Sequence, residues 1–310
     1  MPPRPLISVI APLYNEEAVL ETFYARIKET LEGIDYELVL VNDGSRDRTL
    51  SIAKDLCRRD PRVKLISLSR NFGHQIAITA GLDKASGEAV VIIDADLQDP
   101  PEVIPEMIER WREGCKVVYG VRTKRQGESL FKRLSAAMFY RLMRRLTSVD
   151  IPLDAGDFRL LDRAVVEQLA SMRERHRFLR GLTSWVGFKQ CEVHYTRDPR
   201  FAGETKYPLK KMLGFALDAI FSFSNVPLRM ASLMGFAVSG VSFLLILYGL
   251  GIRLFAPESA IPGWASVFVA ILFLGGVQLI AVGILGEYIA RIYEEVKQRP
   301  LYVIDEEVNC

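Results

Sequence analysis

The first part of the chain alternates short apolar runs with amphipathic stretches. Apolar runs predict strands, and stretches with apolar residues every three or four positions predict helices. Strands are expected at 6–14, 36–44, 63–69 and 89–94, and helices between them at 16–33, 45–60 and 74–86. Strands that are almost continuously apolar are typical of a parallel sheet covered by helices on both faces. The pattern therefore predicts an α/β domain with a mostly parallel sheet.

Two much longer apolar runs follow in the last third of the chain. Residues 230–252 and 259–286 contain no Asp, Glu, Lys or Arg. Because a helix rises about 1.5 Å per residue, about 20 apolar residues cross the hydrocarbon core of a bilayer. A short segment rich in Pro and Gly joins the two runs. We predict a hairpin of two transmembrane helices over 228–290, in preference to two buried core helices.

The positive charges around this hairpin predict its orientation. They lie before the first run and after the second, whereas only Arg253 lies at the turn. The flanking residues are Lys206, Lys210, Lys211 and Arg229, and then Arg291, Lys297 and Arg299. Positive residues favour the cytoplasmic side, so both termini of this multi-pass membrane protein are expected there. No cleavable signal peptide is recognisable, since residues 6–14 form only a short apolar run that contains Pro12.

Two basic amphipathic segments complete the expected organisation. Residues 207–225 are predicted to lie at the membrane surface, and residues 130–147 either do the same or pack on the sheet. The predicted parts are a domain at 1–205, an amphipathic juxtamembrane helix at 206–227, the hairpin at 228–290 and a cytoplasmic tail at 291–310.

Composition excludes several classes of function. The net charge is only +2, so no basic field points to a nucleic-acid partner. No G-x-G-x-x-G follows the first strand and no P-loop motif is present, which argues against a dinucleotide oxidoreductase and a P-loop ATPase. The four cysteines, Cys57, Cys115, Cys191 and Cys310, are scattered and form no C-x-x-C. We expect reduced, unpaired thiols in a cytoplasmic compartment and no zinc site.

Polar residues gather where the predicted strands end. They are Asn15 and Glu16, then Asp43, then Arg70 and Asn71, and finally Asp94 and Asp96. Ligands of parallel α/β sheets bind outside the carboxyl ends of the strands. The rim formed by these residues is therefore the expected binding site.

The pair Asp94 and Asp96 carries the strongest chemical signal. In the following "DPPE", Asp99 is expected to cap the next helix, which leaves the first two aspartates without a structural task. A turn after the strand can bring both carboxylates to one ligand. Two hard oxygen donors suit Mg²⁺ or Mn²⁺, which proteins usually bind together with substrate phosphates.

The chain resembles the family 2 glycosyltransferases of the polyprenyl-phosphate branch, which include bactoprenol glucosyltransferases and dolichyl-phosphate mannose synthases. The matching motifs are "YNEE" (14–17), "VNDGSRDRT" (41–49), "SRNFGHQIAITAG" (69–81), "DADLQDPPE" (94–102), "YGVR" (119–122), "GDFRLLDR" (156–163) and "RFAGETKYPLKK" (200–211). Together with the two apolar runs they cover almost the whole chain and look more like the bacterial glucosyltransferases, which implies a bacterial-type inner membrane. The resemblance implies a GT-A-type sheet with a Rossmann-like nucleotide-binding half.

The resemblance also implies roles for individual residues. The donor-binding residues would be Asp43 at the nucleobase, Asp94 near the nucleoside, Gln98, Arg70 and Arg122. The residues nearest the reaction would be Asp96 on the metal, with Asp94 as a second ligand, Asp157 near the reacting sugar carbon, and Arg200 and Lys206 on phosphate near the membrane. Asp157 could serve as a general base or as an electrostatic, orienting group. His74, at a helix start, is interpreted as a cap or a nucleotide-side contact.

The expected activity is inverting transfer of one hexose, most simply glucose from UDP-glucose, to polyprenyl phosphate at the cytoplasmic face of the bilayer. The Q-x-x-R-W motif of processive polymer synthases is absent, which favours one sugar per acceptor. A GDP-mannose donor is the alternative within enzymes. A catalytically silent, membrane-anchored nucleotide sensor is the alternative of another class. A homo-oligomer is compatible with either reading.

Overall fold

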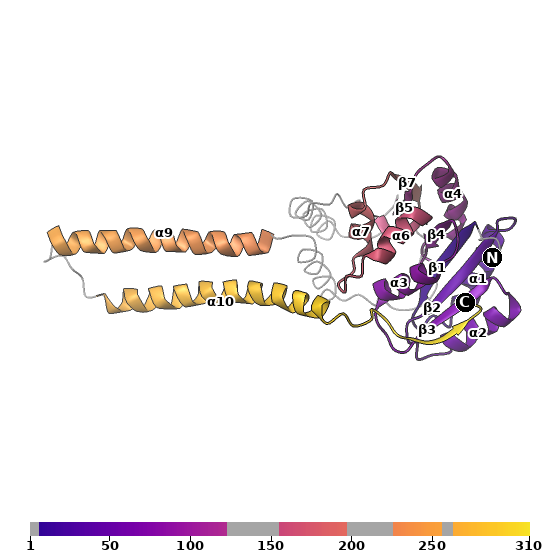
Figure 1. The fold of residues 1–310 in the computed structure, drawn as a ribbon, viewed down its shortest axis with the longest axis horizontal. Coiled ribbons are helices and arrows are strands. Elements are labelled where there is room, and N and C mark those ends of the chain that lie inside the picture. The colour runs from indigo at the N-terminus through magenta and orange to yellow at the C-terminus, as the bar shows by residue number, and fades with distance from the viewer. Residues whose placement is uncertain (1–5, 123–154, 197–225, 256–262) are drawn as a thin grey trace. The chain divides into compact units, whose positions relative to one another are not determined.

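The computed structural model describes residues 6–122, 155–196, 226–255 and 263–310 (Figure 1). The chain divides into two compact units, residues 1–213 with 299–310, and residues 214–298. The predicted interfacial segments at 130–147 and 207–225 lie outside the described residues, as do Arg200 and Lys206. Each unit is described on its own.

The first unit is built on an eight-stranded mixed sheet in the order β7-β5-β6-β4-β1-β2-β3-β8. The strands are β1 (Ile7–Leu13), β2 (Tyr36–Asn42), β3 (Val63–Leu68), β4 (Ala89–Ile92), β5 (Val117–Arg122), β6 (Ala155–Asp162), β7 (Gln190–Tyr195) and β8 (Ile304–Val308). β1 to β4 are parallel to one another, and β5 is parallel to β7. β6 and β8 run antiparallel to their neighbours. The predicted mostly parallel α/β sheet is confirmed.

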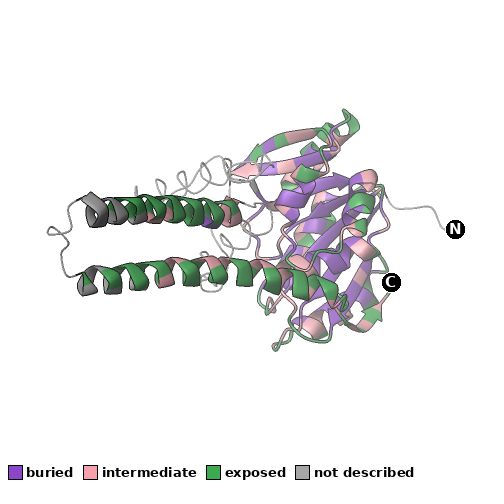
Figure 2. Cartoon of the chain, turned by 60° about the vertical axis from the view of Figure 1, so that its left-hand side comes forward, coloured by how far each residue is buried: buried purple, intermediate pink, exposed green. Residues whose placement is uncertain are grey.

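The order β3-β2-β1-β4 makes a switch point between β1 and β4, because the chain passes from one side of β1 to the other. Such a switch point opens a crevice at the carboxyl ends of the strands. Every residue of β1, β2 and β4 is buried, and the middle of the sheet is mostly purple in Figure 2. Burial on both faces explains why these strands lack the alternation of polar and apolar residues.

Helices cover both faces of the sheet. They are α1 (Leu20–Thr30), α2 (Thr49–Arg59), α3 (His74–Lys84), the 3₁₀ turn η1 (Pro101–Val103), α4 (Ile104–Arg112), α6 (Arg163–Ser171) and α7 (Leu179–Trp185). α1, α2 and α4 share one core with Ile7, Val9 and Ala11 of β1. α3 lies on the other face, where a Cβ on Gly81 would overlap the side chain of Ile10. This close approach holds α3 directly on the central strand.

The second unit is a pair of long helices, α9 (Val226–Phe255) and α10 (Trp264–Val296). Both are long and apolar enough to cross a membrane. Their described residues are mostly exposed, and both helices are largely green in Figure 2, which is compatible with helices that face lipid. α10 continues past residue 290, the predicted end of the hairpin, to Val296.

The last residues of the chain return to the sheet. β8 pairs antiparallel with β3, with Val308 opposite Leu65 and Ile304 opposite Leu68. Tyr302 Oη donates a 2.8 Å hydrogen bond to Asp83 at the end of α3. The ion pairs Lys54–Glu306 (2.5 Å) and Lys84–Glu307 (2.7 Å) fasten the same segment. The end of the segment predicted as a tail is therefore an edge strand of the first unit.

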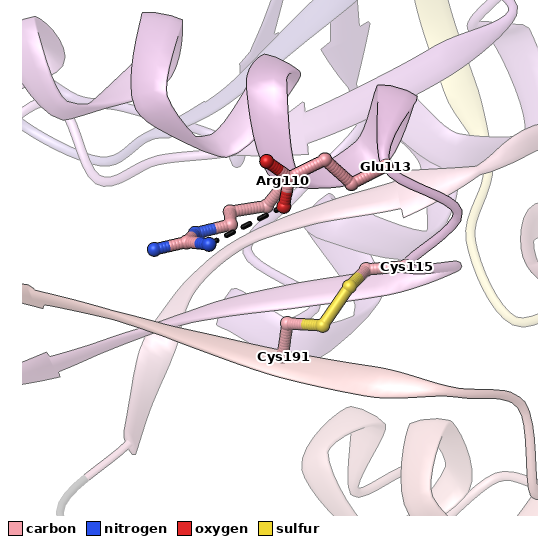
Figure 3. Close-up of a disulfide and its surroundings, with 4 residues drawn as sticks. All are labelled: Arg110, Glu113, Cys115 and Cys191. Atoms are coloured by element: carbon pink, nitrogen blue, oxygen red, sulfur yellow. Dashed lines mark hydrogen bonds and ion pairs between the residues drawn. A yellow bond between two sulfur atoms is a disulfide. The ribbon is translucent and has the colours of Figure 1, made fainter.

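The thiols are not all free. Cys115, just before β5, and Cys191, in β7, form a disulfide (Figure 3). The parallel pairing of β5 with β7 brings their Cα atoms to 5.9 Å, although they lie 76 positions apart in sequence. Among the described residues Cys57 and Cys310 are free thiols. The prediction of four unpaired cysteines is wrong for this pair, so the cysteines no longer argue for a reducing compartment.

Candidate active site

The segment after β4 presents its polar side chains on one side. Asp94, Asp96 and Gln98 are half-buried, whereas Ala95 and Leu97 between them are buried. The backbone N–H of Gln98 donates a 3.1 Å hydrogen bond to Oδ1 of Asp96. Leu97 has a φ of 61°, a left-handed conformation that side chains of its kind rarely adopt. Such strain costs about 1–3 kcal/mol and collects at functional sites.

A histidine joins two of the predicted site carboxylates. Nε2 of His74 lies 3.5 Å from Oδ1 of Asp94 and 3.3 Å from Oδ2 of Asp157. Burial by itself would lower the pKa of His74, but the two carboxylates outweigh it and raise that pKa to about 9. Burial, together with the carboxylates of Asp157, Asp99 and Asp96, raises the pKa of Asp94 to about 6, although His74 opposes the shift. The site therefore concentrates negative charge around one imidazolium.

Asp157 is held by three side chains. Arg180 Nε donates a 2.7 Å hydrogen bond to Oδ1, and Gln75 Nε2 donates one of 3.3 Å to Oδ2, the oxygen that His74 also approaches. Gln75 in turn accepts a 3.0 Å hydrogen bond from the backbone N–H of Leu179, the first residue of α7. Burial would raise the pKa of Asp157, but Arg180 and His74 hold it well below its usual range. Asp157 is thus a fixed negative charge.

Arg122 is the last residue of β5, the strand between β7 and β6. Its Nε donates a 3.3 Å hydrogen bond to the phenol oxygen of Tyr195, and its Nη2 lies 3.6 Å from Oδ1 of Asp99. The predicted capping role of Asp99 is wrong. η1 begins at Pro101 with Pro100 in the capping position, because a residue before proline favours an extended backbone. The carboxylate of Asp99 is left to bind Tyr195 and Arg122.

Asp43 shapes the loop that leads into α3. Its carboxylate accepts hydrogen bonds from the backbone N–H groups of Phe72 (2.7 Å) and Gly73 (3.0 Å). Gly73 has a φ of 102°, which favours glycine at this position. Arg70 is exposed and lies over the ring of Phe72, with its guanidinium carbon 4.0 Å from the ring centre. Asp43 therefore fixes the backbone just ahead of His74, and Arg70 lies at the open side of that loop.

The residues present fit a divalent cation that substrate also binds. Within the described ranges no group of three or more His, Cys, Asp and Glu side chains could hold a metal by itself. Asp94 and Asp96 supply two carboxylates on one side of a short turn, in a region crowded with negative charge. Mg²⁺ and Mn²⁺ commonly bind through one or two carboxylates together with substrate phosphates. The donor set suits that mode and not a closed protein cage.

The structure brings together most of the described residues that the sequence assigns to the site. Asp94 and Asp157 meet through His74, and the charges of Asp96 and Asp99 reach Asp94. The sequence-based reading missed the roles of four residues: His74, Gln75, Arg180 and Tyr195. The first two lie inside the "SRNFGHQ" motif, which could have marked them, whereas no sequence signal distinguishes Arg180 or Tyr195. Arg200 and Lys206 stay predictions.

Comparison with known proteins places the chain in a family. The model of "Glycosyl transferase family 2" matches residues 8–170. An uncharacterised glycosyltransferase of Bacillus subtilis, YkcC, is 55% identical over 96% of this chain and 92% of its own length. The prophage bactoprenol glucosyl transferase homolog of Escherichia coli is 44% identical over 96% of this chain and 98% of its own length. The bactoprenol glucosyl transferase of Shigella phage SfII is 45% identical over 96% and 97%.

Among solved structures, glucosyl-3-phosphoglycerate synthase from Mycobacterium tuberculosis, in complex with Mn²⁺, UDP and phosphoglyceric acid, aligns with a TM-score of 0.46. That alignment has 22% identity and covers 70% of this chain and 76% of the other. The family match spans more than half of the chain, and the close relatives match it almost from end to end. The chain therefore belongs to glycosyl transferase family 2.

Proposed function

We propose that this protein transfers a single glucose, with inversion, from UDP-glucose to polyprenyl phosphate at the cytoplasmic face of the membrane. The observation that carries the proposal is 44–45% identity, over 96% of the chain, to proteins named bactoprenol glucosyl transferase. The likeness extends over nearly all of both chains and is not confined to the family 2 domain at 8–170. A lipid acceptor suits a chain with two helices that could cross a bilayer.

The donor would lie across the crevice between β1 and β4. Asp43 would read the nucleobase with the lone pairs that its two backbone hydrogen bonds leave available, since each carboxylate oxygen has two. Arg70, exposed above Phe72, would meet the nucleotide at the open side. Asp94 and Gln98 would line the path from nucleoside to diphosphate.

Asp96, with Asp94, would hold Mg²⁺ or Mn²⁺ together with the donor diphosphate. A cation in that position neutralises the charge that develops on the departing diphosphate. The half-buried carboxylates of the turn at 94–98 supply its protein ligands. Leu97, between Asp96 and Gln98, has a left-handed conformation, and the backbone N–H of Gln98 donates a hydrogen bond to Asp96 within that turn.

Asp157 would act by its charge rather than as a base. Arg180, Gln75 and His74 already occupy its two oxygens, so the carboxylate is a poor proton acceptor. A phosphate acceptor has little need for a base, because its second pKa is about 6 and it is largely dianionic at neutral pH. A fixed carboxylate near the anomeric carbon stabilises the positive charge that develops there and orients the acceptor.

Arg122, together with Arg200 and Lys206, would bind the phosphate of the acceptor or the donor. Tyr195 and Asp99 hold the guanidinium of Arg122 in place, which reduces the entropy lost when it binds phosphate. Arginine pairs well with phosphate because its N–H groups form a planar fork. Arg200 and Lys206 enter this proposal from the sequence motif alone.

The proposed topology has both termini on the cytoplasmic side. β8, which follows α10, pairs with β3 of the unit that precedes α9. The chain must therefore return to the side from which it left, which requires an even number of crossings. Two spans satisfy this requirement, and the positive residues on both flanks favour the cytoplasm for that side.

The direct test is incubation of the purified full chain with polyprenyl phosphate and, separately, UDP-glucose, UDP-galactose or GDP-mannose, followed by mass measurement of the lipid product. We expect a gain of one hexose with UDP-glucose. A product with GDP-mannose alone would assign the mannosyltransferase alternative. Nucleotide binding without any lipid product would assign the catalytically silent sensor instead.

A further inference from the structure

His74 occupies an unusual position for a helix residue. It is the first residue of α3, and its Nε2 approaches carboxylates that come from two different strands. Asp94 follows β4 and Asp157 belongs to β6, and the two lie 3.5 Å and 3.3 Å from the same nitrogen. One imidazole nitrogen therefore lies within ion-pair distance of two carboxylates that the proposed function places in the site.

The contacts of His74 with the two carboxylates neither cap α3 nor anchor it to the sheet. Gly73 is the capping residue of the helix, and no side chain caps it, so His74 does not serve as the predicted cap. α3 is anchored by its buried middle, from Ala77 to Leu82, and by Gly81 against Ile10. The imidazole itself is about one-third exposed. The ion pairs of the imidazole therefore hold the two carboxylates and not the helix.

The two carboxylate oxygens of Asp157 have different partners. Arg180 binds Oδ1, whereas Oδ2 receives only side chains from the first turn of α3, His74 and Gln75, among the hydrogen bonds and ion pairs given above. Gln75 also binds the backbone of α7, so it joins two helices. His74 instead joins Asp157 to Asp94. Without that bridge, two partly buried like charges repel each other and their separation is no longer fixed.

We propose that His74 is a positioning residue for sugar transfer: its Nε2 fixes the carboxylates of Asp94 and Asp157 relative to each other. The inference deepens the proposed function and rests on it. In the proposed function Asp94 faces the donor nucleotide and Asp157 faces the reacting carbon. Fixing their separation aligns the bound donor with the charge that stabilises its transition state, an effect that lowers kcat when it is lost.

The test compares two neutral replacements in the full chain. The side-chain amide nitrogen of glutamine reaches about as far as Nε2 of histidine, whereas that of asparagine reaches only about as far as Nδ1. A hydrogen bond to a charged group is worth roughly ten- to a hundredfold in rate. We expect His74→Asn to lower kcat by about that factor with the KM for UDP-glucose changed less than about threefold. His74→Gln should recover at least half of the loss on a logarithmic scale.

His176, an exposed histidine just before α7, provides the matched control. His176→Asn should leave kcat and KM unchanged. Equal kcat for His74→Gln and His74→Asn would overturn the proposal, since reach would then not matter. A rise in KM without a fall in kcat would also overturn it, because His74 would then be a donor-binding residue.

A second measurement does not depend on activity. Thermal unfolding of His74→Asn, Asp157→Asn and the double variant, without metal or donor, forms a double-mutant cycle. We expect the two single shifts in Tm to be clearly non-additive; additive shifts would mean that the contact is absent in solution. If the wild type makes no lipid-linked sugar while the cycle is non-additive, the proposed function is wrong and the role in transfer fails with it. If the wild type is active and the cycle is additive, this inference alone fails.

Discussion

The phenol of Tyr195 donates a 2.5 Å hydrogen bond to the buried carboxylate of Asp99, which lies 96 positions earlier in the chain. The two residues connect the end of β7 with the loop before η1, and Arg122 at the end of β5 contacts both. The three groups form one network in which Asp99 and Tyr195 are buried and Arg122 is partly exposed. Tyr195 and Asp99, which are not predicted to bind ligand, therefore form a frame that orients the guanidinium of Arg122.

Removing one hydroxyl tests this frame. Tyr195→Phe deletes the donor to Asp99 and the acceptor for Arg122, so it should destabilise the protein by about 1–3 kcal/mol. It should also lower transfer, because the guanidinium of Arg122 loses its orientation. Unfolding in denaturant and steady-state kinetics measure the two effects. Tyr24→Phe removes a comparable 3.0 Å hydrogen bond, to Asp60, and should reduce stability without changing kcat. Equal kinetic effects of both variants would contradict the role of the frame.

Asp96→Asn should abolish most transfer while the protein stays folded. An amide oxygen is a weaker ligand than a carboxylate for a hard cation. Thermal stabilisation by UDP should require Mn²⁺ or Mg²⁺ in the wild type and should be lost in the variant. EDTA should reproduce the defect, and only the wild type should recover when the cation is restored. Asp55→Asn, at an exposed ion pair on α2, is the matched control and should behave as wild type. Full transfer in EDTA would remove the metal from the proposal.

Asp157→Asn should lose most activity, and the pH dependence of what remains decides its role. If the carboxylate acts by its charge, residual transfer should rise through roughly pH 6 with the acceptor phosphate and then level off, as in the wild type. An essential base would instead leave a variant that gains rate at high pH or is rescued by formate or azide. We expect no rescue, because Arg180, Gln75 and His74 already bind both oxygens of the wild-type carboxylate.

The exposed thiol of Cys310 reports the topology directly. A maleimide that does not cross membranes should label it in inside-out vesicles and leave it unlabelled in sealed, right-side-out vesicles. Cys57 is buried and Cys115 is bonded to Cys191, so Cys310→Ser should remove the signal. Labelling from the outside of right-side-out vesicles would overturn the cytoplasmic placement of the C-terminus. It would also move the first unit, because β8 pairs with β3.

The pair Asp60 and Arg62 should govern part of the acid stability. Hydrogen bonds from Arg62, with partial opposition from burial, lower the pKa of Asp60 from its usual value near 4 to about 2. A lowered folded-state pKa stabilises the protein above the unfolded pKa, and this contribution disappears as pH falls from about 4 to about 2. It amounts to about 2 kcal/mol. Asp60→Asn should flatten the free energy of unfolding over that window, whereas an unchanged slope would contradict the assignment.

The sequence by itself determined the features that depend on local pattern. Continuous apolar runs predicted β1 to β4, amphipathic spacing predicted α1 to α3, and uncharged runs predicted α9 and α10. The motif with Asp94 and Asp96 marked the candidate site, because the carboxyl ends of parallel strands meet at one edge whatever the details of packing. Family membership followed from motifs spread along the chain.

Only the tertiary structure decided which distant residues share a contact. β8 is five residues long and carries three acidic side chains, so it has no strand signal until β3 offers it an edge. The disulfide of Cys115 and Cys191 depends on the pairing of β5 with β7. Gln75 meets Asp157 across 82 positions and Tyr195 meets Asp99 across 96. Periodicity describes neighbours along one element, whereas these contacts arise from the order in which the strands assemble.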